Sequence, residues 1–272
     1  MTPAVRRRVA RRASSGEETT DSACYVFCIV EYSGQPSLPD GLPRLPSGSV
    51  PRALALAPGI WLAVADVPLK EYSKAAIERC LQDLDCVSVR AVAHEATIAG
   101  FFQRWPVIPL KLFTIFATEE RALAHIRRRL VLVRRLLGTV RHREEWGIRL
   151  TILPGELPAA PPAHMAGSGR DYLEAKKVRR RQSMPATGVA THKEASWALS
   201  SLSKMAERTR RQKAVGVGPQ AVLQAAFLVS SRRSNAWKSH ARTLGLRLAK
   251  RGCRIEITGP WPPYNFVSAR PS

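Results

Sequence analysis

The chain has 272 residues and a formal net charge of +22, from 43 Lys and Arg against 21 Asp and Glu. This length allows one large domain or two ordinary ones, so neither a metal nor a disulfide is needed to stabilise a core. The five cysteines show no CxxC pair and no zinc-ligand spacing, which predicts reduced, mostly buried thiols. No apolar run reaches the ~20 residues of a membrane span, and the N-terminal arginines lead into no signal-peptide pattern, so a cytoplasmic protein is expected.

The positive charge is concentrated in two segments. Residues 1–16 hold five Arg and residues 121–143 hold eight, with no acidic residue in either. A polyanion or acidic partner would explain this charge, and a coding bias that leaves solvated basic faces explains it equally well. Residues 1–22 are charged, rich in Ser and Thr and without periodicity, which predicts a disordered basic arm.

Residues 23–143 are predicted to form an α+β domain. Residues 24–32 are nearly all apolar, which indicates a central strand buried on both faces. Prolines recur from 33 to 59, so that stretch is expected to be a loop in which residues 52–57 could pair at a sheet edge. Residues 60–67 and 107–116 are predicted strands. Ser73 can cap a helix that runs to residue 84, and a second helix is expected at 89–102.

Residues 118–137 give the clearest helix pattern in the chain. Thr118 is a suitable N-cap, and apolar side chains recur every three or four residues from Leu123 to Leu137. Burial of each contributes roughly 1.5 to 3 kcal/mol, so core packing should position this helix. The opposite side is left as a free basic face and a candidate partner surface, formed by Arg127, Arg128, Arg134 and Arg135.

Residues 144–258 are predicted to form a second domain, with a boundary near residue 143. Strands are expected at 146–153 and 221–230 and up to residue 258, with a weak edge candidate at 214–217. A loop at 154–169 precedes helices at 171–181 and 193–213, and another helix at 235–251 ends at Gly252. This order is βαββαβ, the ferredoxin-like arrangement.

The tail, residues 259–272, begins with three prolines that lack backbone donors and fix φ. We therefore expect an extended ribbon rather than sheet or helix. It carries Trp261, Tyr264 and Phe266, which either pack locally on the domain or also form a partner surface.

The terminal motif GPWPPYNF resembles that of the gas vesicle protein F/L family and is highly specific for it. Five upstream segments also resemble segments of that family and occur in the same order along the chain. The family's usual LPLRFGT reads IPLKLFT here, with Lys111, Leu112 and Phe113 as the departures. The resemblance implies the same two-domain α+β fold and an assembly factor or minor shell-associated protein that binds the hydrophobic shell protein and other accessory proteins. The upstream segments are residues 25–32, His94-Glu95, residues 108–114 with Thr118-Glu119-Glu120, Glu145-Trp146-Gly147, and residues 168–173.

No catalytic, cofactor or metal site is predicted. His94-Glu95 starts an HExxH motif, but Ile98 replaces the second histidine, which excludes a zinc metalloprotease. The pair is interpreted instead as a hydrogen-bonding pair on a helix surface or hinge. Ser201 and Lys204 match SxxK without the motifs that accompany it in penicillin-binding enzymes. An enzyme is therefore not expected.

The alternative function is a basic nucleic-acid-binding protein. It depends on charge alone, because the predicted central strands lack the aromatic residues that RNA-recognition modules place there.

Overall fold

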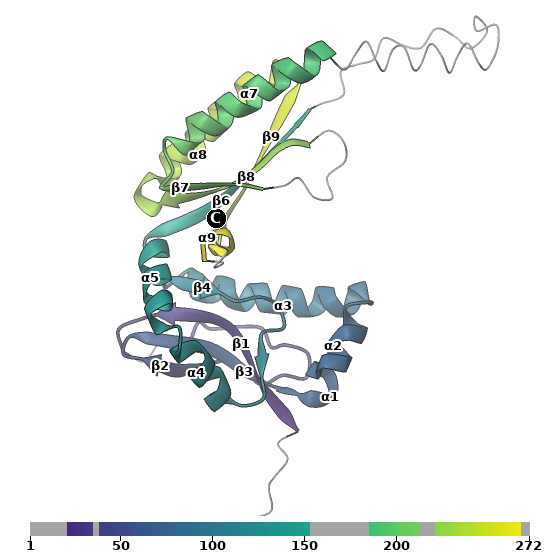
Figure 1. Ribbon diagram of the computed structural model, residues 1–272, viewed down its shortest axis with the longest axis vertical. Coiled ribbons are helices and arrows are strands. Elements are labelled where there is room, and N and C mark those ends of the chain that lie inside the picture. Colours follow the sequence, from purple (N-terminus) through teal and green to yellow (C-terminus); the bar gives the residue numbers. More distant parts are fainter. Residues whose placement is uncertain (1–20, 35–37, 153–184, 213–220, 268–272) are drawn as a thin grey trace, which may run out of the picture.

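The computed structural model describes residues 21–34, 38–152, 185–212 and 221–267, which form two antiparallel sheets with helices packed on them (Figure 1). The first sheet has the order β2-β3-β1-β4, and β5 also pairs with β1. The second sheet has the order β7-β8-β6-β9. The strands of the first sheet are β1 (Ser22–Glu31), β2 (Arg52–Ala57), β3 (Ile60–Pro68), β4 (Val107–Pro109) and β5 (Ile115–Phe116), and those of the second are β6 (Arg143–Ile152), β7 (Arg208–Gln212), β8 (Ala221–Ser230) and β9 (Cys253–Trp261).

Strand β1 is the central strand of the first sheet, as its apolar sequence predicts. Tyr25 and Phe27 point into a core that also contains residues of the helix α3 (Leu84–Phe102). Cys24 and Val26 point to the other face, where α4 (Glu119–Arg127) and α5 (Leu130–Val140) cover the sheet. The predicted edge strand at residues 52–57 is also confirmed, because β2 pairs only with β3 within the described sheet.

Two predicted N-caps form as expected. The Ser73 hydroxyl accepts a hydrogen bond from the Ala76 amide and starts α2 (Lys74–Cys80), which follows the short helix α1 (Leu69–Tyr72). The Thr118 hydroxyl accepts from the Arg121 amide and starts α4. Helix α3 begins earlier than predicted, because the Asp83 carboxylate caps the amides of Asp85 and Cys86.

The predicted helix over residues 118–137 is interrupted. The backbone leaves helical geometry at Arg129, with φ −113° and ψ 19°, so α4 and α5 are separate helices. Ile126 of α4 and Leu137 of α5 still pack in one core. The apolar spacing predicted the buried side chains, and it could not show the break between the two helices.

The predicted strand over residues 107–116 is also interrupted. A turn between β4 and β5 is closed by the Thr114 amide, which donates to the Lys111 carbonyl at 3.1 Å. Phe113 adopts a positive φ of 62°, a left-handed conformation that a regular strand cannot contain.

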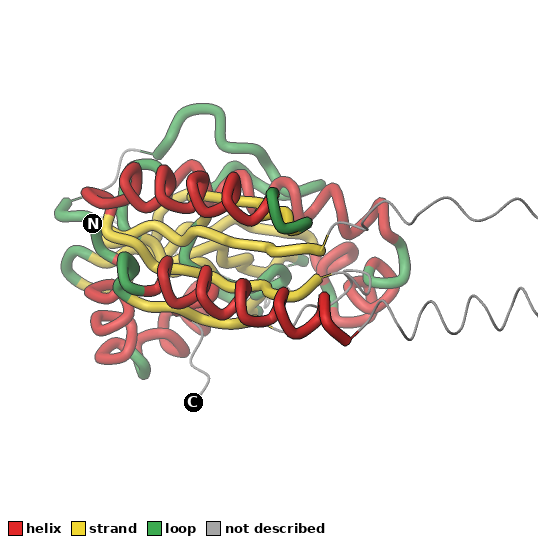
Figure 2. Tube along the Cα trace, turned by 90° about the horizontal axis from the view of Figure 1, so that it is seen from above, coloured by secondary structure: helices red, strands yellow, loops and turns green. Residues whose placement is uncertain are grey.

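The second sheet is covered on one face by α7 (Pro185–Ser203) and α8 (Ser234–Ala249), and a short 3-10 helix, η2 (Ser231–Arg233), precedes α8. Trp146, Phe227 and Trp237 pack together between this face and the helices. Seen from above, the strands of the molecule occupy the middle of the projection with helices along both sides (Figure 2). Helix α8 ends close to its predicted limit, and Gly252 beyond it has a positive φ of 71°.

The edge strand of the second sheet is not where the sequence predicts it. The helix expected at residues 193–213 ends at Ser203, and β7 follows at Arg208–Gln212. The sequence of β7, RTRRQ, has no apolar residue, so it lacks the alternation by which a strand is recognised. The predicted strand at 214–217 and helix at 171–181 lie outside the described residues.

The expectation that residues beyond Gly259 form neither sheet nor helix is wrong. Strand β9 continues to Trp261, and residues Tyr264–Val267 form one helical turn, α9. Gly259 allows this continuation because it adopts a φ of 116°, and a Cβ there would lie 2.7 Å from the Glu145 carbonyl oxygen. Gly259 and Pro260 of β9 lie opposite the single residue Trp146, a bulge with one extra residue, and Trp261 then pairs with Glu145.

The expectation that all five cysteines are reduced is also wrong. Cys80 and Cys86 form a disulfide, and Cys24, Cys28 and Cys253 are free and buried. A six-residue separation across the α2–α3 corner brings the two residues close enough to bond, which spacing rules for CxxC or zinc sites do not detect. In the described part of the chain, no helix is long and apolar enough to cross a membrane.

Candidate functional site

The helical turn α9 lies between the two sheets (Figure 1) and contacts both halves of the molecule. Tyr264 packs beside the core on the α3 side of the first sheet, and Val267 belongs to the core between that sheet and α5. Asn265 faces the second sheet on the face opposite α7 and α8, as the alternation along β6 shows. We call the segment from Trp261 to Val267 the clamp.

The clamp is joined to the first half by a hydrogen bond from Tyr264. Its hydroxyl donates to the Glu95 carboxylate of α3 at 2.7 Å. Burial, and then the neighbouring Glu95 carboxylate, raise the pKa of Tyr264 well above its ordinary value, so the hydroxyl keeps its proton and remains a donor. The contact connects residues 169 positions apart in the sequence.

The clamp is joined to the second half through Asn265. Its backbone amide donates to Glu145 at 2.9 Å, and its side-chain amide donates to the other oxygen of the same carboxylate. Gln212 donates to the Asn265 side-chain oxygen at 2.7 Å, and Arg210 donates to its carbonyl at 2.5 Å. One side chain therefore connects β6 and β7 to α9.

Glu145 is the buried charge of this site, with only 4% of its surface exposed. Burial raises its pKa, while the Asn265 donors and the charge of Arg210 oppose that effect. Gly147, on the same face, leaves room for the neighbouring strand: a Cβ there would lie 2.4 Å from the Thr258 hydroxyl. In this segment, Glu145 accepts hydrogen bonds from the clamp, and Trp146 packs in the core on the other face of the sheet. Gly147 has no side chain that would collide with Thr258 of β9.

The three predicted aromatic residues have different environments. Trp261 is 52% exposed at the end of β9, directly before two buried prolines, Pro262 and Pro263. Tyr264 is half-buried and bonded as described above. Phe266 is half-buried, and its amide donates to the Pro263 carbonyl at 3.1 Å. Asn265, between them, bonds to residues of both β6 and β7, and it was not predicted as a site residue because an isolated Asn carries no sequence pattern.

The predicted basic face is exposed but does not adjoin the clamp through these side chains. Arg128, Arg134 and Arg135 are exposed on the outer side of α4 and α5, whereas α9 packs near the buried side of α5. The expectation that all four arginines are free is wrong for Arg127, whose Nε donates to the Leu56 carbonyl at 3.0 Å. The break at Arg129 divides the four residues between two helices.

His94 and Glu95 point in different directions from α3. His94 is 1% exposed, so its placement on a helix surface is wrong, although both residues do form hydrogen bonds. Its Nε2 lies 3.2 Å from the Leu110 carbonyl oxygen, which can only accept, so Nδ1 accepts from the Tyr25 hydroxyl at 2.8 Å. Burial lowers the pKa of His94 to about 4, and the ring is neutral at physiological pH.

Ser201 and His240, from neighbouring helices, form a hydrogen-bonded pair. Ser201 of the SxxK match lies 2.8 Å from His240 Nε2, and this pair joins α7 to α8. Among the described residues, no group of three or more His, Cys, Asp or Glu side chains could hold a metal ion.

Comparisons with known proteins agree on one family. The family model described as gas vesicle synthesis protein GvpL/GvpF matches residues 23–268. A gas vesicle protein L from Streptomyces sp. (strain CB03234) is 30% identical over 262 residues, which cover 92% of this chain and 94% of that protein.

Two crystal structures have the same fold. GvpF from Anabaena sp. PCC7120 superposes with a TM-score of 0.62 at 13% identity, covering 92% of this chain and 97% of that one. GvpF from Microcystis aeruginosa gives a TM-score of 0.57 at 14% identity, with coverages of 90% and 99%.

Proposed function

The chain belongs to the gas vesicle synthesis protein GvpL/GvpF family, and from this premise we propose that it acts in gas vesicle formation as a non-enzymatic accessory protein. In this role it binds the hydrophobic shell protein and other accessory proteins, in the cytoplasm and at the growing vesicle. The family membership gives no support to the alternative of a nucleic-acid-binding protein.

The two halves are assigned to separate domains, residues 23–143 and 144–258. The strand order β7-β8-β6-β9, with α7 and α8 on one face, supports a ferredoxin-like assignment for the second domain. Residues 259–272 are its tail, and the clamp lies within the described part of that tail, residues 259–267. Under this assignment Glu95 and Glu145 belong to different domains, and the clamp holds both.

The exposure of Trp261 is the observation that supports a partner surface. Its ring is 52% exposed, although the residues after it are buried or bonded to both halves. An aromatic side chain on a fixed backbone loses little conformational entropy when it enters a partner's pocket, and tryptophan is enriched at the centres of interfaces. Trp261 is therefore the proposed anchor, and Tyr264 and Phe266 hold the clamp that presents it.

The exposed arginines have a secondary role in this proposal. Arg128, Arg134 and Arg135 form a basic surface that attracts acidic segments of partners, or polyanions weakly and without specificity. Arg127 contributes less, because its guanidinium is bonded to the β2 backbone.

The test is a pull-down of the tagged full-length chain from cells that express the complete gas vesicle cluster. Trp261→Ala is compared with Trp197→Ala, which truncates another exposed tryptophan, 41% exposed on α7. We expect Trp261→Ala to lose capture of shell and accessory proteins at an unchanged melting temperature, and Trp197→Ala to retain it. Normal capture and normal vesicles with Trp261→Ala would exclude this tryptophan as the anchor, and failure of the wild type to capture any vesicle protein would exclude the proposed function.

A further inference from the structure

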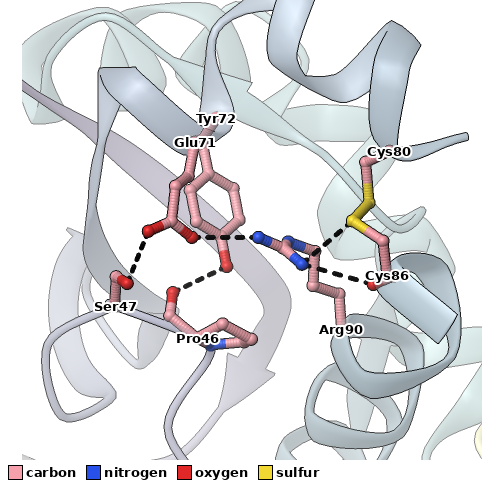
Figure 3. Close-up of polar contacts among 7 residues, drawn as sticks. All are labelled: Pro46, Ser47, Glu71, Tyr72, Cys80, Cys86 and Arg90. Atoms are coloured by element: carbon pink, nitrogen blue, oxygen red, sulfur yellow. Dashed lines mark hydrogen bonds and ion pairs between the residues drawn. A yellow bond between two sulfur atoms is a disulfide. The ribbon is translucent and has the colours of Figure 1, made fainter. Parts of the chain in front are cut away.

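The Cys80–Cys86 disulfide closes the corner between α2 and α3 (Figure 3). Cys80 is the last residue of α2 and is 6% exposed, whereas Cys86 lies in the first turn of α3 and is half-buried. The corner between them is at the surface, with Leu81 55% and Leu84 79% exposed. A small molecule in solution can therefore approach the corner, and Cys86 is the more exposed of the two cysteine residues.

A guanidinium is held against Cys86. Arg90 Nη1 lies 3.1 Å from Cys86 Sγ and donates to the Cys86 carbonyl at 3.3 Å (Figure 3). In the reduced protein this permanent positive charge favours the thiolate of Cys86 over its thiol. The position of Cys86 in the first turn of a 19-residue helix acts in the same direction. Cys80 is the last residue of α2, at the negative end of that helix's dipole, so it lacks this stabilisation of a thiolate.

Arg90 is fixed by contacts that do not depend on the disulfide. Its Nη2 pairs with Glu71 at 2.9 Å, and Glu71 also accepts from the Ser47 hydroxyl at 2.6 Å. The guanidinium lies over the Tyr72 ring, 5.2 Å from its centroid, and the Tyr72 hydroxyl donates to the Pro46 carbonyl. None of these contacts involves Cys80 or Cys86, so opening the disulfide breaks none of them.

Two of the acidic groups near the corner, Glu71 and Asp83, already have hydrogen-bonding partners. Glu71 is paired with Arg90, and the Asp83 carboxylate accepts from the amides of Asp85 and Cys86. The Asp85 carboxylate, also in the first turn of α3, is the remaining acidic neighbour on this helix. These contacts weaken, but do not abolish, the electrostatic repulsion between the nearby carboxylates and a thiolate at Cys86.

We propose that Cys80 and Cys86 form a redox-active dithiol, in which Cys86 is the attacking thiolate and Cys80 the resolving thiol. Its oxidant is a low-molecular-weight disulfide, and its reductant is the corresponding thiol. The proposal is independent of the partner surface at Trp261.

The reaction consists of two thiol–disulfide exchanges. The Cys86 thiolate attacks one sulfur of the small disulfide, a mixed disulfide forms, and the first small thiolate leaves. Cys80 then loses its proton to solvent and its sulfur attacks Cys86 Sγ, which forms the Cys80–Cys86 bond and releases the second small thiolate. The two cysteines are oxidised by two electrons and the small disulfide is reduced to two thiols. Reduction follows the same steps in reverse.

The other three cysteines are internal controls. Cys24, Cys28 and Cys253 are buried, and burial raises the pKa of Cys24 to about 11 and also raises the pKa of Cys28 and of Cys253. They should react slowly with any reagent in the folded protein.

The experiment measures alkylation of each cysteine by iodoacetamide in the reduced full-length protein, as a function of pH and by mass spectrometry. We expect Cys86 to titrate below the ordinary thiol pKa of about 8.5 and to react at pH 7 roughly tenfold faster than the same thiol in the Arg90→Met variant. Arg79→Met is the matched control, because Arg79 is exposed in the last turn of α2 beside Cys80. It should leave the Cys86 rate unchanged.

A second measurement does not depend on the Arg90 variant. Glutathione disulfide should restore the Cys80–Cys86 bond in the reduced wild type, and in Cys80→Ser the reaction should stop at one glutathione on Cys86. Alkylation of Cys86 at the rate of an ordinary peptide thiol, or glutathione disulfide that forms no Cys80–Cys86 bond, would overturn the proposal. A mixed disulfide on another cysteine would overturn the assignment of Cys86 as the attacking group.

Discussion

Asn265 offers the sharpest test of the clamp, because its side chain bonds to two strands of the second sheet. The change Asn265→Ala removes the donor to the Glu145 carboxylate and the acceptor of Gln212. The two backbone contacts of Asn265, to Glu145 and from Arg210, remain possible. Glu145 is 4% exposed, so water cannot readily replace the lost amide.

The expected loss of stability follows from these two contacts. A hydrogen bond to a charged group contributes roughly 1.5 to 3 kcal/mol, and a neutral one roughly 0.5 to 1.5 kcal/mol. Asn265→Ala should therefore lower the free energy of unfolding by about 2 to 4.5 kcal/mol at pH 7. Gln212→Ala is the matched control, since it removes only the neutral bond and should cost about 1 kcal/mol.

The loss caused by Asn265→Ala should also depend on pH. The side-chain amide stabilises the ionised form of Glu145, so its removal raises the pKa of this carboxyl further in the folded state. The penalty is then largest where Glu145 is ionised in both folded proteins, and it decreases as pH falls through their raised folded-state pKa values, above the ordinary carboxyl value, because the unfolded state titrates identically in the two proteins. Urea denaturation of both variants at pH 7 and pH 4 measures this. A penalty below about 1 kcal/mol, or one equal at the two pH values, would show that the Asn265–Glu145 contact does not hold the clamp.

Three further predictions concern other parts of the chain. The pKa of His94 is lowered from 6.5 to about 4 in the folded protein, so the unfolded state binds more protons between these two pH values. The free energy of unfolding should therefore fall by about 3 kcal/mol as pH falls from 6.5 to 4. His94→Gln should flatten this part of the curve of stability against pH, and an unchanged slope would contradict a buried, neutral His94. Deletion of residues 1–20 should leave the melting temperature unchanged, since that segment has few apolar residues and β1 begins at Ser22; a drop of several degrees would show that the segment packs. Binding to nucleic acid should be no tighter than ~10⁻⁴ to 10⁻⁶ M at physiological salt and should weaken steeply as salt rises; specific, salt-resistant binding would favour the alternative function.

The parts of the fold that the sequence predicts well are those with strong local signals. The apolar run of β1, the caps at Ser73 and Thr118, and the apolar spacing of α4 and α5 each involve residues close in sequence. The parts that were missed depend on contacts between distant residues. Strand β7 is polar and exists through its pairing with β8, and α9 follows two prolines that suggested an extended chain.

Phe113 has a backbone conformation that sequence patterns do not predict for a phenylalanine. Its φ of 62° lies in the region that glycine adopts without steric cost. A non-glycine residue there costs roughly 1 kcal/mol or more. The Phe113 amide donates to the Tyr25 hydroxyl and its ring packs beside the same core, which offsets that cost.

The candidate site could be predicted only in part, because it requires both sheets to be folded before its residues meet. His94 and Glu95 illustrate this, since neighbours on a helix point about 100° apart. One enters the core to meet Tyr25, and the other faces the clamp to meet Tyr264. Three of the motif segments that carried the family resemblance meet at a single contact region, because Glu95 and Glu145 accept from Tyr264 and Asn265, consecutive residues of the terminal motif. A segment that packed only locally would not need acceptors on α3 of the first half and on β6 of the second, so this convergence favours control of the relative position of the two halves as the structural role of the clamp.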